Sequence, residues 1–188
     1  MTASYTVEQA LTLAVERGLH KYSRQPYEDY LLLAWQQQML KDGEFVKIFH
    51  HSCLAPAKFF DMFKPPNTLY YSQDPRTQLI DVAMWFEPSP FGAFCGVWMH
   101  KSVRHGPAAF KRLQAAYAIG FSYFELLGGV TTQEALLPVH RKLGYTVACK
   151  LPYRLNDRPA WLIFFSREAF ACSKMNPFRL RSQQRRRA

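Results

Sequence analysis

The alternation of element types in the second half of the chain constrains the fold more than any other feature. Two short apolar runs with strand character, at 94–99 and 123–127, stand on either side of a helical pattern at 108–119. Two parallel strands need a crossover of about a dozen residues, usually a helix, so this order predicts that the two runs are parallel neighbours. We expect the strands to splay near Gly96 or Gly128, where a small residue permits a bulge.

The remaining sequence predicts two N-terminal helices, further strands and a second helical unit. Thr6 and Gln9 have the spacing of a capping box, and Pro26 suits the first position of a second helix, which Gly43 ends. The other expected elements are strands at 44–50, 78–86, 146–153 and 160–166, short helices at 55–63 and 134–143, and a turn at Asn156-Asp157. This order predicts an α/β (α+β) fold with a central, mostly antiparallel sheet, flanking helices and one parallel strand pair.

Residues at helical spacing predict the long helices. Leu11, Val15 and Leu19 have this spacing in the first helix and Tyr30, Leu33, Ala34 and Gln37 in the second, whereas Phe110, Leu113 and Tyr117 supply the buried stripe of the third. The third set is sufficient to explain its helix without any ligand.

Positive charge is concentrated at the C-terminus. Residues 174–188 contain six Lys/Arg residues and no acid, whereas residues 1–173 contain 18 bases and 14 acids. We therefore expect a folded domain at 1–173 and a basic tail at 174–188. A solvated tail is one interpretation, and an arm that contacts nucleic acid or an acidic protein is the other. The candidate contact residues are Arg179, Arg181, Arg185, Arg186 and Arg187.

Several classes of protein are not expected from this sequence. No apolar run reaches the ~18 residues of a membrane helix, and the N-terminus lacks a signal-peptide pattern, so we expect a cytoplasmic protein. The four cysteines form no Cys-x-x-Cys pair, which favours free thiols. His50 and His51 would point to opposite faces of a strand, so we expect no metal site.

Two segments of the second half carry candidate chemistry. In Val103-Arg104-His105-Gly106-Pro107-Ala108, small residues precede a helix whose N-terminal amides can hold an anion. Basic residues lie on both sides of Gly106, and no carboxylate occurs between Glu87 and Glu125. The second segment, residues 133–145, reads QEALLPVHRKLGY, and Pro138 should displace the start of its helix.

These segments and the element order resemble the GNAT (Gcn5-related N-acetyltransferase) superfamily over about residues 6–168. The resemblance implies acetyl-coenzyme A (acetyl-CoA) as the cofactor, with its pyrophosphate on the loop and helix N-terminus. The implied cofactor-binding residues are Arg104, Gly106, Ala108, Ala109 and Lys111. His140 stands where the family has the tyrosine that protonates the departing thiolate, and Glu125 or Glu87 would be the general base.

The chain departs from the family pattern at several chemical positions. Val103 stands where Gln or Arg is expected, Gln133 replaces Asn, Leu136 replaces Ala, and Pro107 removes one amide donor. These departures favour a non-catalytic or weakly active binding component of a larger assembly near nucleic acid, similar to divergent proteins of bacteriophages, which would place it in a virion. The alternative is an acetyl-CoA-dependent N-acetyltransferase that acts on an amine.

Overall fold

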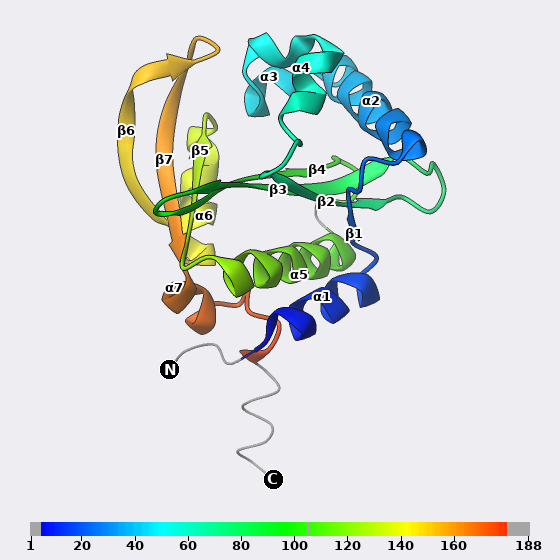
Figure 1. The fold of residues 1–188 in the computed structure, drawn as a ribbon. Helices are drawn as coiled ribbons and strands as arrows, with labels where there is room; N and C mark the ends of the chain where they lie inside the picture. The colour runs from blue at the N-terminus through cyan, green and yellow to red at the C-terminus, as the bar shows by residue number, and fades with distance from the viewer. Residues whose placement is uncertain (1–4, 105, 180–188) are drawn as a thin grey trace.

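A seven-stranded sheet forms the centre of the computed structural model, which describes residues 5–104 and 106–179 (Figure 1). The strand order is β1-β2-β3-β4-β5-β7-β6, and every neighbouring pair is antiparallel except the parallel pair β4–β5. This arrangement confirms the predicted fold class. The strands are β1 (His20–Lys21), β2 (Thr68–Gln73), β3 (Ile80–Ser89), β4 (Gly92–Met99), β5 (Leu126–Thr131), β6 (Thr146–Leu155) and β7 (Arg158–Ser166).

Helices cover both faces of the sheet (Figure 1). One face carries α2 (Pro26–Lys41), α3 (Phe45–Ile48) and α4 (Pro56–Asp61). The other carries α1 (Val7–Glu16), α5 (Pro107–Tyr123), α6 (Leu137–Leu143) and α7 (Arg167–Cys172). Two short 3₁₀ helices are η1 (His51–Leu54) and η2 (Glu134–Leu136). No helix among the described residues is long and apolar enough to span a membrane.

The two faces have separate hydrophobic cores. On the α2 face, the indole of Trp35 is fully buried and contacts the rings of Phe49, Phe59 and Trp98. On the α5 face, small residues of α5 let the helix lie close to the sheet, and an ideal Cβ at Gly120 would meet the Phe86 ring at 2.5 Å. The sheet is therefore covered on both sides at β3 and β4.

The predicted helix starts are confirmed, but some residues at the predicted helical spacing are exposed, among them Phe110 of the buried stripe predicted for α5, which is 37% exposed. The Thr6 hydroxyl accepts from the Gln9 amide at 3.1 Å, and Pro26 and Pro107 begin α2 and α5. Val15 is 74% exposed and Tyr30 is 80% exposed. The buried residues are instead Ala10, Leu13 and Ala14 in α1, and Glu28, Leu32, Trp35, Gln36 and Met39 in α2. Small alanines suit the close contact of α1 with α5, and the large Trp35 sets the inner face of α2.

The strand predicted at 44–50 is wrong, because this segment contains the helix α3. Phe45 and Phe49 are four residues apart and each is 1% exposed, so the helical period decides the structure here. The run at 123–127 is also shifted. Helix α5 continues to Tyr123, and β5 extends beyond residue 127 through Gly128 and Gly129.

Other boundaries differ less. Strand β3 extends to Ser89, beyond the predicted end at residue 86, and β1, β2 and α7 were not predicted. Helix α6 starts at Leu137 with Pro138 in its first turn, which confirms the predicted displacement. The turn between β6 and β7 is also confirmed, since Asn156 and Asp157 have φ values of 48° and 61°. Such values suit a two-residue hairpin turn.

Candidate active site

Strands β4 and β5 pair only at one end. Ala93 lies opposite Leu127 and Phe94 opposite Gly128, whereas β4 continues to Met99. The strands are still close one residue further along, where an ideal Cβ on Gly129 would lie 3.2 Å from the Cys95 carbonyl oxygen. Beyond this point the pairing ends, so the strands diverge into a wedge. The predicted parallel pair and its splay near Gly128 are thus confirmed.

The N-terminus of α5 follows the end of β4 through a short loop. Gly106 is the N-cap of α5 and Pro107 its first residue, and no side chain among the described residues caps the helix. The amides of Ala108 and Ala109 therefore belong to the uncapped first turn, where the helix dipole attracts anions. Ala108 and Lys111 are exposed, whereas the side chain of Ala109 is buried.

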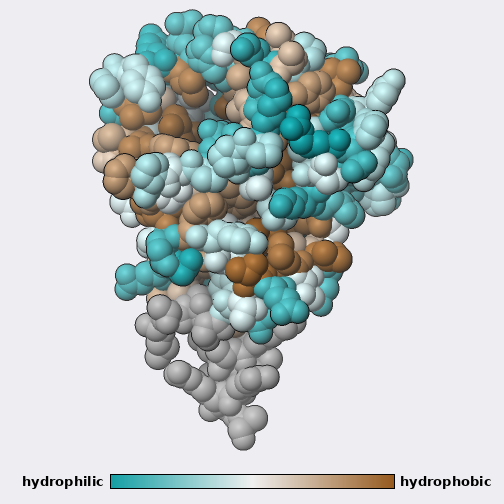
Figure 2. Space-filling model, in the orientation of Figure 1, coloured by the Kyte–Doolittle hydropathy of each residue, from teal (hydrophilic) through white to brown (hydrophobic). Residues whose placement is uncertain are grey.

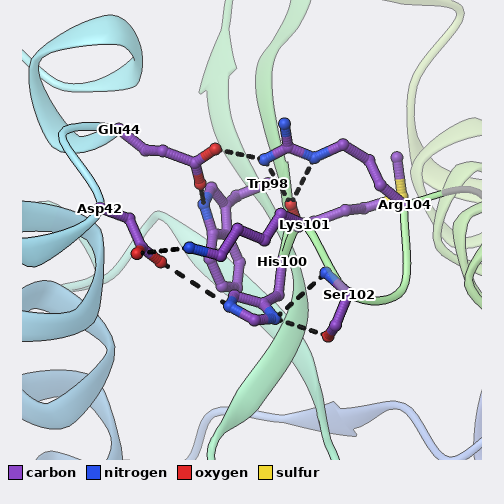
Figure 3. A network of polar contacts seen from close by, with 8 residues as sticks. Asp42, Glu44, Trp98, His100, Lys101, Ser102 and Arg104 are labelled. Atoms are coloured by element: carbon purple, nitrogen blue, oxygen red, sulfur yellow. Dashed lines mark hydrogen bonds and ion pairs between the residues drawn. The ribbon is translucent and has the colours of Figure 1, made fainter.

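Arg104, which was predicted to support a phosphate, is engaged by the protein itself (Figure 3). Its Nε and Nη2 donate to the Met99 carbonyl oxygen at 3.1 and 3.0 Å, and its guanidinium forms an ion pair with Glu44. Glu44 also accepts a hydrogen bond of 3.0 Å from Trp98 Nε1. In this arrangement Arg104 stabilises the loop by contact with the start of α3.

A second set of contacts fixes the same loop from α2 (Figure 3). Asp42 Oδ1 accepts from Lys101 Nζ at 2.8 Å, and Asp42 Oδ2 lies 3.7 Å from His100 Nε2. The hydrogen bond from Lys101 is the main cause that lowers the pKa of Asp42. His100 Nδ1 lies 2.6 Å from the Ser102 hydroxyl. Residues 100–104 are therefore held in one conformation by the α2–α3 junction.

His140, the predicted general acid, lies half-buried in α6. Its Nδ1 is buried without a hydrogen-bond partner among the described residues, and its ring centroid is 5.2 Å from that of Tyr145. Burial lowers the pKa of His140 below its usual value. The neutral imidazole is thus favoured at pH 7, and a neutral imidazole accepts a proton more readily than it donates one.

The two carboxylates that were predicted as general bases, Glu125 and Glu87, have different surroundings. Glu125 precedes β5, is 77% exposed and forms an ion pair of 2.5 Å with Arg167. Glu87 lies in β3 directly opposite Phe94, the last β4 residue that pairs with β5. Burial raises the pKa of Glu87. Glu87 is therefore the carboxylate that lies beside the wedge, and only the strand register could reveal this.

The remaining predicted residues lie away from this site or outside the described residues. Arg179 donates to the Cys172 carbonyl oxygen, while Arg181, Arg185, Arg186 and Arg187 lie outside the described residues. His50 and His51 are not in a strand, and their ring centroids are 4.0 Å apart, so the geometric reason given against a metal site is wrong. Among the described residues no group of three or more His, Cys, Asp or Glu side chains could hold a metal.

Comparisons with known proteins find similar structures but no similar sequence among the family models and curated proteins. No protein-family model and no curated protein matches the sequence. A mutant of spermidine N-acetyltransferase SpeG from Vibrio cholerae has a TM-score of 0.60 at 8% identity, over 81% of this chain and 96% of that chain. Ribosomal-protein-S5-alanine acetyltransferase from Vibrio fischeri has a TM-score of 0.60 at 9% identity, over 80% of this chain and 94% of that chain. Escherichia coli ElaA has a TM-score of 0.60 at 9% identity, over 79% of this chain and 99% of that chain.

This chain has the GNAT fold. At identities of 8–9% the similarity establishes the fold and not the activity. One structure of spermidine N-acetyltransferase from Vibrio cholerae, with a TM-score of 0.58, is a complex with CoA and spermine. The wedge between β4 and β5 and the uncapped start of α5 are the features of this GNAT fold that can be tested for a ligand.

Proposed function

We propose that this protein binds acetyl-CoA and transfers its acetyl group to an amine. The observation that carries the proposal is the wedge between β4 and β5, together with the uncapped first turn of α5, which follows β4 through a short loop. A phosphate fits this turn because its amides have no side-chain cap among the described residues and no carboxylate occurs between Glu87 and Glu125. Gly106, Ala108, Ala109 and Lys111 would hold the cofactor, which when bound would supply an acetyl thioester.

Glu87, which lies opposite the residue where the β4–β5 pairing ends, suits the proton transfer that the reaction needs. An amine attacks only in its neutral form, so a base must accept its proton. Glu87 is suited to this role, because burial raises the pKa of its carboxyl group and so gives the carboxylate more affinity for a proton.

Isothermal titration with acetyl-CoA tests the proposal directly. Binding should be seen with the full chain, and Gly106→Glu should weaken it about 100-fold relative to Gly106→Gln. The two variants match in size, and like charges ~4 Å apart near a protein surface repel by several kcal/mol. No heat with millimolar acetyl-CoA and the full chain would reject the proposal. Equal losses in both variants would mean that shape, not an anion site, explains them.

A non-catalytic binding component of a larger assembly is the second candidate. It is favoured by the engagement of Arg104 with Glu44 and by His140 in place of the expected tyrosine. In this case acetyl-CoA would bind weakly or not at all, and the tail would contact a protein or nucleic acid of the assembly. A bacteriophage origin and a place in a virion stay predictions from the sequence.

A further inference from the structure

One row of side chains crosses the sheet at the point where the β4–β5 pairing ends. Glu87 of β3 lies opposite Phe94 of β4, and Phe94 lies opposite Gly128 of β5. Gly128 in turn lies opposite Phe164 of β7. Residues directly opposite each other on paired strands point to the same face of the sheet, and in antiparallel pairs their Cβ atoms lie about 5 Å apart. We call these four residues the Glu87 row.

The Glu87 row lies on the face of the sheet that carries α2, α3 and α4. Trp85, two residues before Glu87 in β3, has the same orientation and belongs to the core under these helices. Helix α5, whose first turn is the proposed phosphate site, covers the opposite face. Because the β4–β5 pairing ends at this row, a molecule bound on the row lies at the start of the wedge, on the side away from α5.

Two aromatic rings of the row lie next to each other because Gly128 has no side chain. An ideal Cβ on Gly128 would lie 3.2 Å from the ring of Phe164 and 3.6 Å from the ring of Phe94. Phe94 is 46% exposed and Phe164 is half-buried, so both rings are accessible to a ligand. Figure 2 shows hydrophobic residues gathered on the side of the molecule where β5 and β7 lie in Figure 1. The row thus offers an apolar surface beside one carboxylate.

Glu87 is the ionisable residue of the row, and its charge is not balanced by the protein. None of the ion pairs between described residues includes Glu87. Its carboxylate is half-buried, and the hydrogen bond with Trp85 supplies no charge. A half-buried carboxylate without a cation is costly, and a bound ammonium group would remove this cost.

The neighbouring positions on the same face add no second acid. Two residues further along each strand toward the wedge, these positions are Trp85, Gly96, Val130 and Leu162. Val130 is 41% exposed, so the apolar surface continues along β5. A ligand on this surface therefore has one place for a positive charge, at Glu87, and apolar contacts elsewhere.

We infer that the acceptor is a primary amine joined to an apolar group, and not a polyamine. Its ammonium group pairs with Glu87, and its apolar group lies on the rings of Phe94 and Phe164. The charge of Glu87 and the apolar surface beside it are complementary to these two parts of the ligand. The further ammonium groups of a polyamine would lose water on this surface without gaining a partner. The inference rests on the proposed function, in which Glu87 accepts the proton of the same amine.

Direct binding to the full chain tests the ligand class. The probes are 2-phenylethylamine, 2-phenylethanol, which lacks the charge, ethylamine, which lacks the ring, and spermidine. Each is followed by NMR titration with and without CoA, at about 0.15 M salt, where repulsion between distant charges is screened. 2-Phenylethylamine should bind about tenfold more tightly than 2-phenylethanol, since hydrogen bonds between charged groups are stronger than those of a neutral hydroxyl. It should also bind more tightly than ethylamine and spermidine.

Two variants with matched controls test the residues of the row. Glu87→Gln keeps the size of the side chain and removes its charge, so the preference for the amine over the alcohol should disappear. Glu168→Gln removes an exposed acid from α7, on the other face, and should keep the preference. Phe94→Leu should weaken 2-phenylethylamine about threefold and leave ethylamine unchanged, since one aromatic contact is lost. Tyr123→Leu changes an exposed ring at the end of α5 and should affect neither.

The failure of this inference differs from the failure of the proposed function. Equal binding of 2-phenylethylamine and 2-phenylethanol, tighter binding of spermidine, or no binding of any probe overturns the inference whatever acetyl-CoA does. An unchanged preference in Glu87→Gln, or its loss in Glu168→Gln, overturns the role of Glu87. Binding of 2-phenylethylamine through Glu87 by a chain that does not bind acetyl-CoA supports the amine site and rejects only the acetyl transfer. Binding of both supports both proposals, and acetylation of 2-phenylethylamine then completes the test.

Discussion

The two halves of the sheet are held by different kinds of contact. The buried carboxylates of the described residues, Glu28, Glu44 and Asp81, all contact the β1–β4 half, and each accepts hydrogen bonds from several groups. The β5–β7–β6 half has no buried carboxylate among the described residues. It is held by aromatic contacts, such as Tyr145 with Phe165, which the first half also has, and by the side-chain hydrogen bonds of Asn156. A buried charge is costly unless it is paired, so the first half tolerates single changes poorly.

This difference indicates in which half residues can take part in binding or catalysis with little loss of stability. Groups in the second half that lack partners can change their contacts without exposing a buried charge. An unpartnered buried atom does not by itself mark a site, since Trp35 Nε1 also lacks a described partner. His140 differs from Trp35 because an imidazole can take up a proton, whereas an indole cannot. Four changes, ordered by their effect on the free energy of unfolding, test this comparison.

Asp81→Ala should have the largest effect. Asp81 is 3% exposed and accepts from the Ser72 hydroxyl and from Arg112, each at 2.6 Å. Its removal leaves both donors without this acceptor and should lower the free energy of unfolding by about 3–5 kcal/mol. Urea denaturation measures the loss. Asp61→Ala is the matched control, because Asp61 pairs with Lys64 on the surface, and its denaturation midpoint should not change. A similar midpoint for the two variants would contradict the comparison.

Gly96→Ala in β4 should follow in size. An ideal Cβ at Gly96 would lie 1.9 Å from the ring of Trp85, which is only 4% exposed and cannot move freely. Overpacking of this kind costs about 1–3 kcal/mol. Gly128→Ala in β5 is the control, since its Cβ would meet Phe164 at 3.2 Å and Phe94, which can shift, at 3.6 Å. The free energy of unfolding, measured by denaturation, should fall less for Gly128→Ala than for Gly96→Ala. The reverse order would contradict the statement that the first half tolerates single changes poorly.

The sequence predicts the β5–β7–β6 half better than the β1–β4 half. The β4–α5–β5 crossover and the turn at Asn156 are predictable from local sequence. Proline, glycine and the length of the segment between the two strands are sufficient to indicate them. The error at 44–50 arose because four aromatic and β-branched residues fit a strand, and only the core beyond them shows that Phe45 and Phe49 share one helical face. For the site, the uncapped start of α5 was predictable. The ion pair of Arg104 with Glu44 was not, since those residues are 60 positions apart.

His140→Phe should change stability little at pH 7 but alter its pH dependence. Burial lowers the pKa of His140 in the folded state, so the unfolded chain takes up the proton first as pH falls. The folded protein should therefore lose stability as pH drops below the ordinary histidine pKa of ~6.5. In His140→Phe this part of the loss should disappear, which denaturation at several pH values will show. An unchanged pH dependence would mean that His140 is not buried as described.

Removal of residues 180–188 should leave the free energy of unfolding unchanged and affect only binding. The cut is placed after Arg179 because Met175 is fully buried and Phe178 stacks on Tyr5 at 4.6 Å, so an earlier cut would damage the domain. The deletion removes four arginines, Arg181, Arg185, Arg186 and Arg187. Each neutralised phosphate contributes about −0.9 to the slope of log affinity against log salt on duplex DNA.

If these four arginines contact phosphates, the full chain should lose roughly 100-fold in affinity for random duplex DNA between 50 and 200 mM salt. The truncated chain should lose far less and bind more weakly at low salt. A variant with the four arginines changed to lysine should keep both the affinity and the slope, since contacts to phosphate need charge and not a specific side chain. Changing them to glutamine should reproduce the truncation. Equal DNA binding by the full and truncated chains would reject the nucleic-acid role, and an acidic protein surface would then be the better explanation for this cluster of charge.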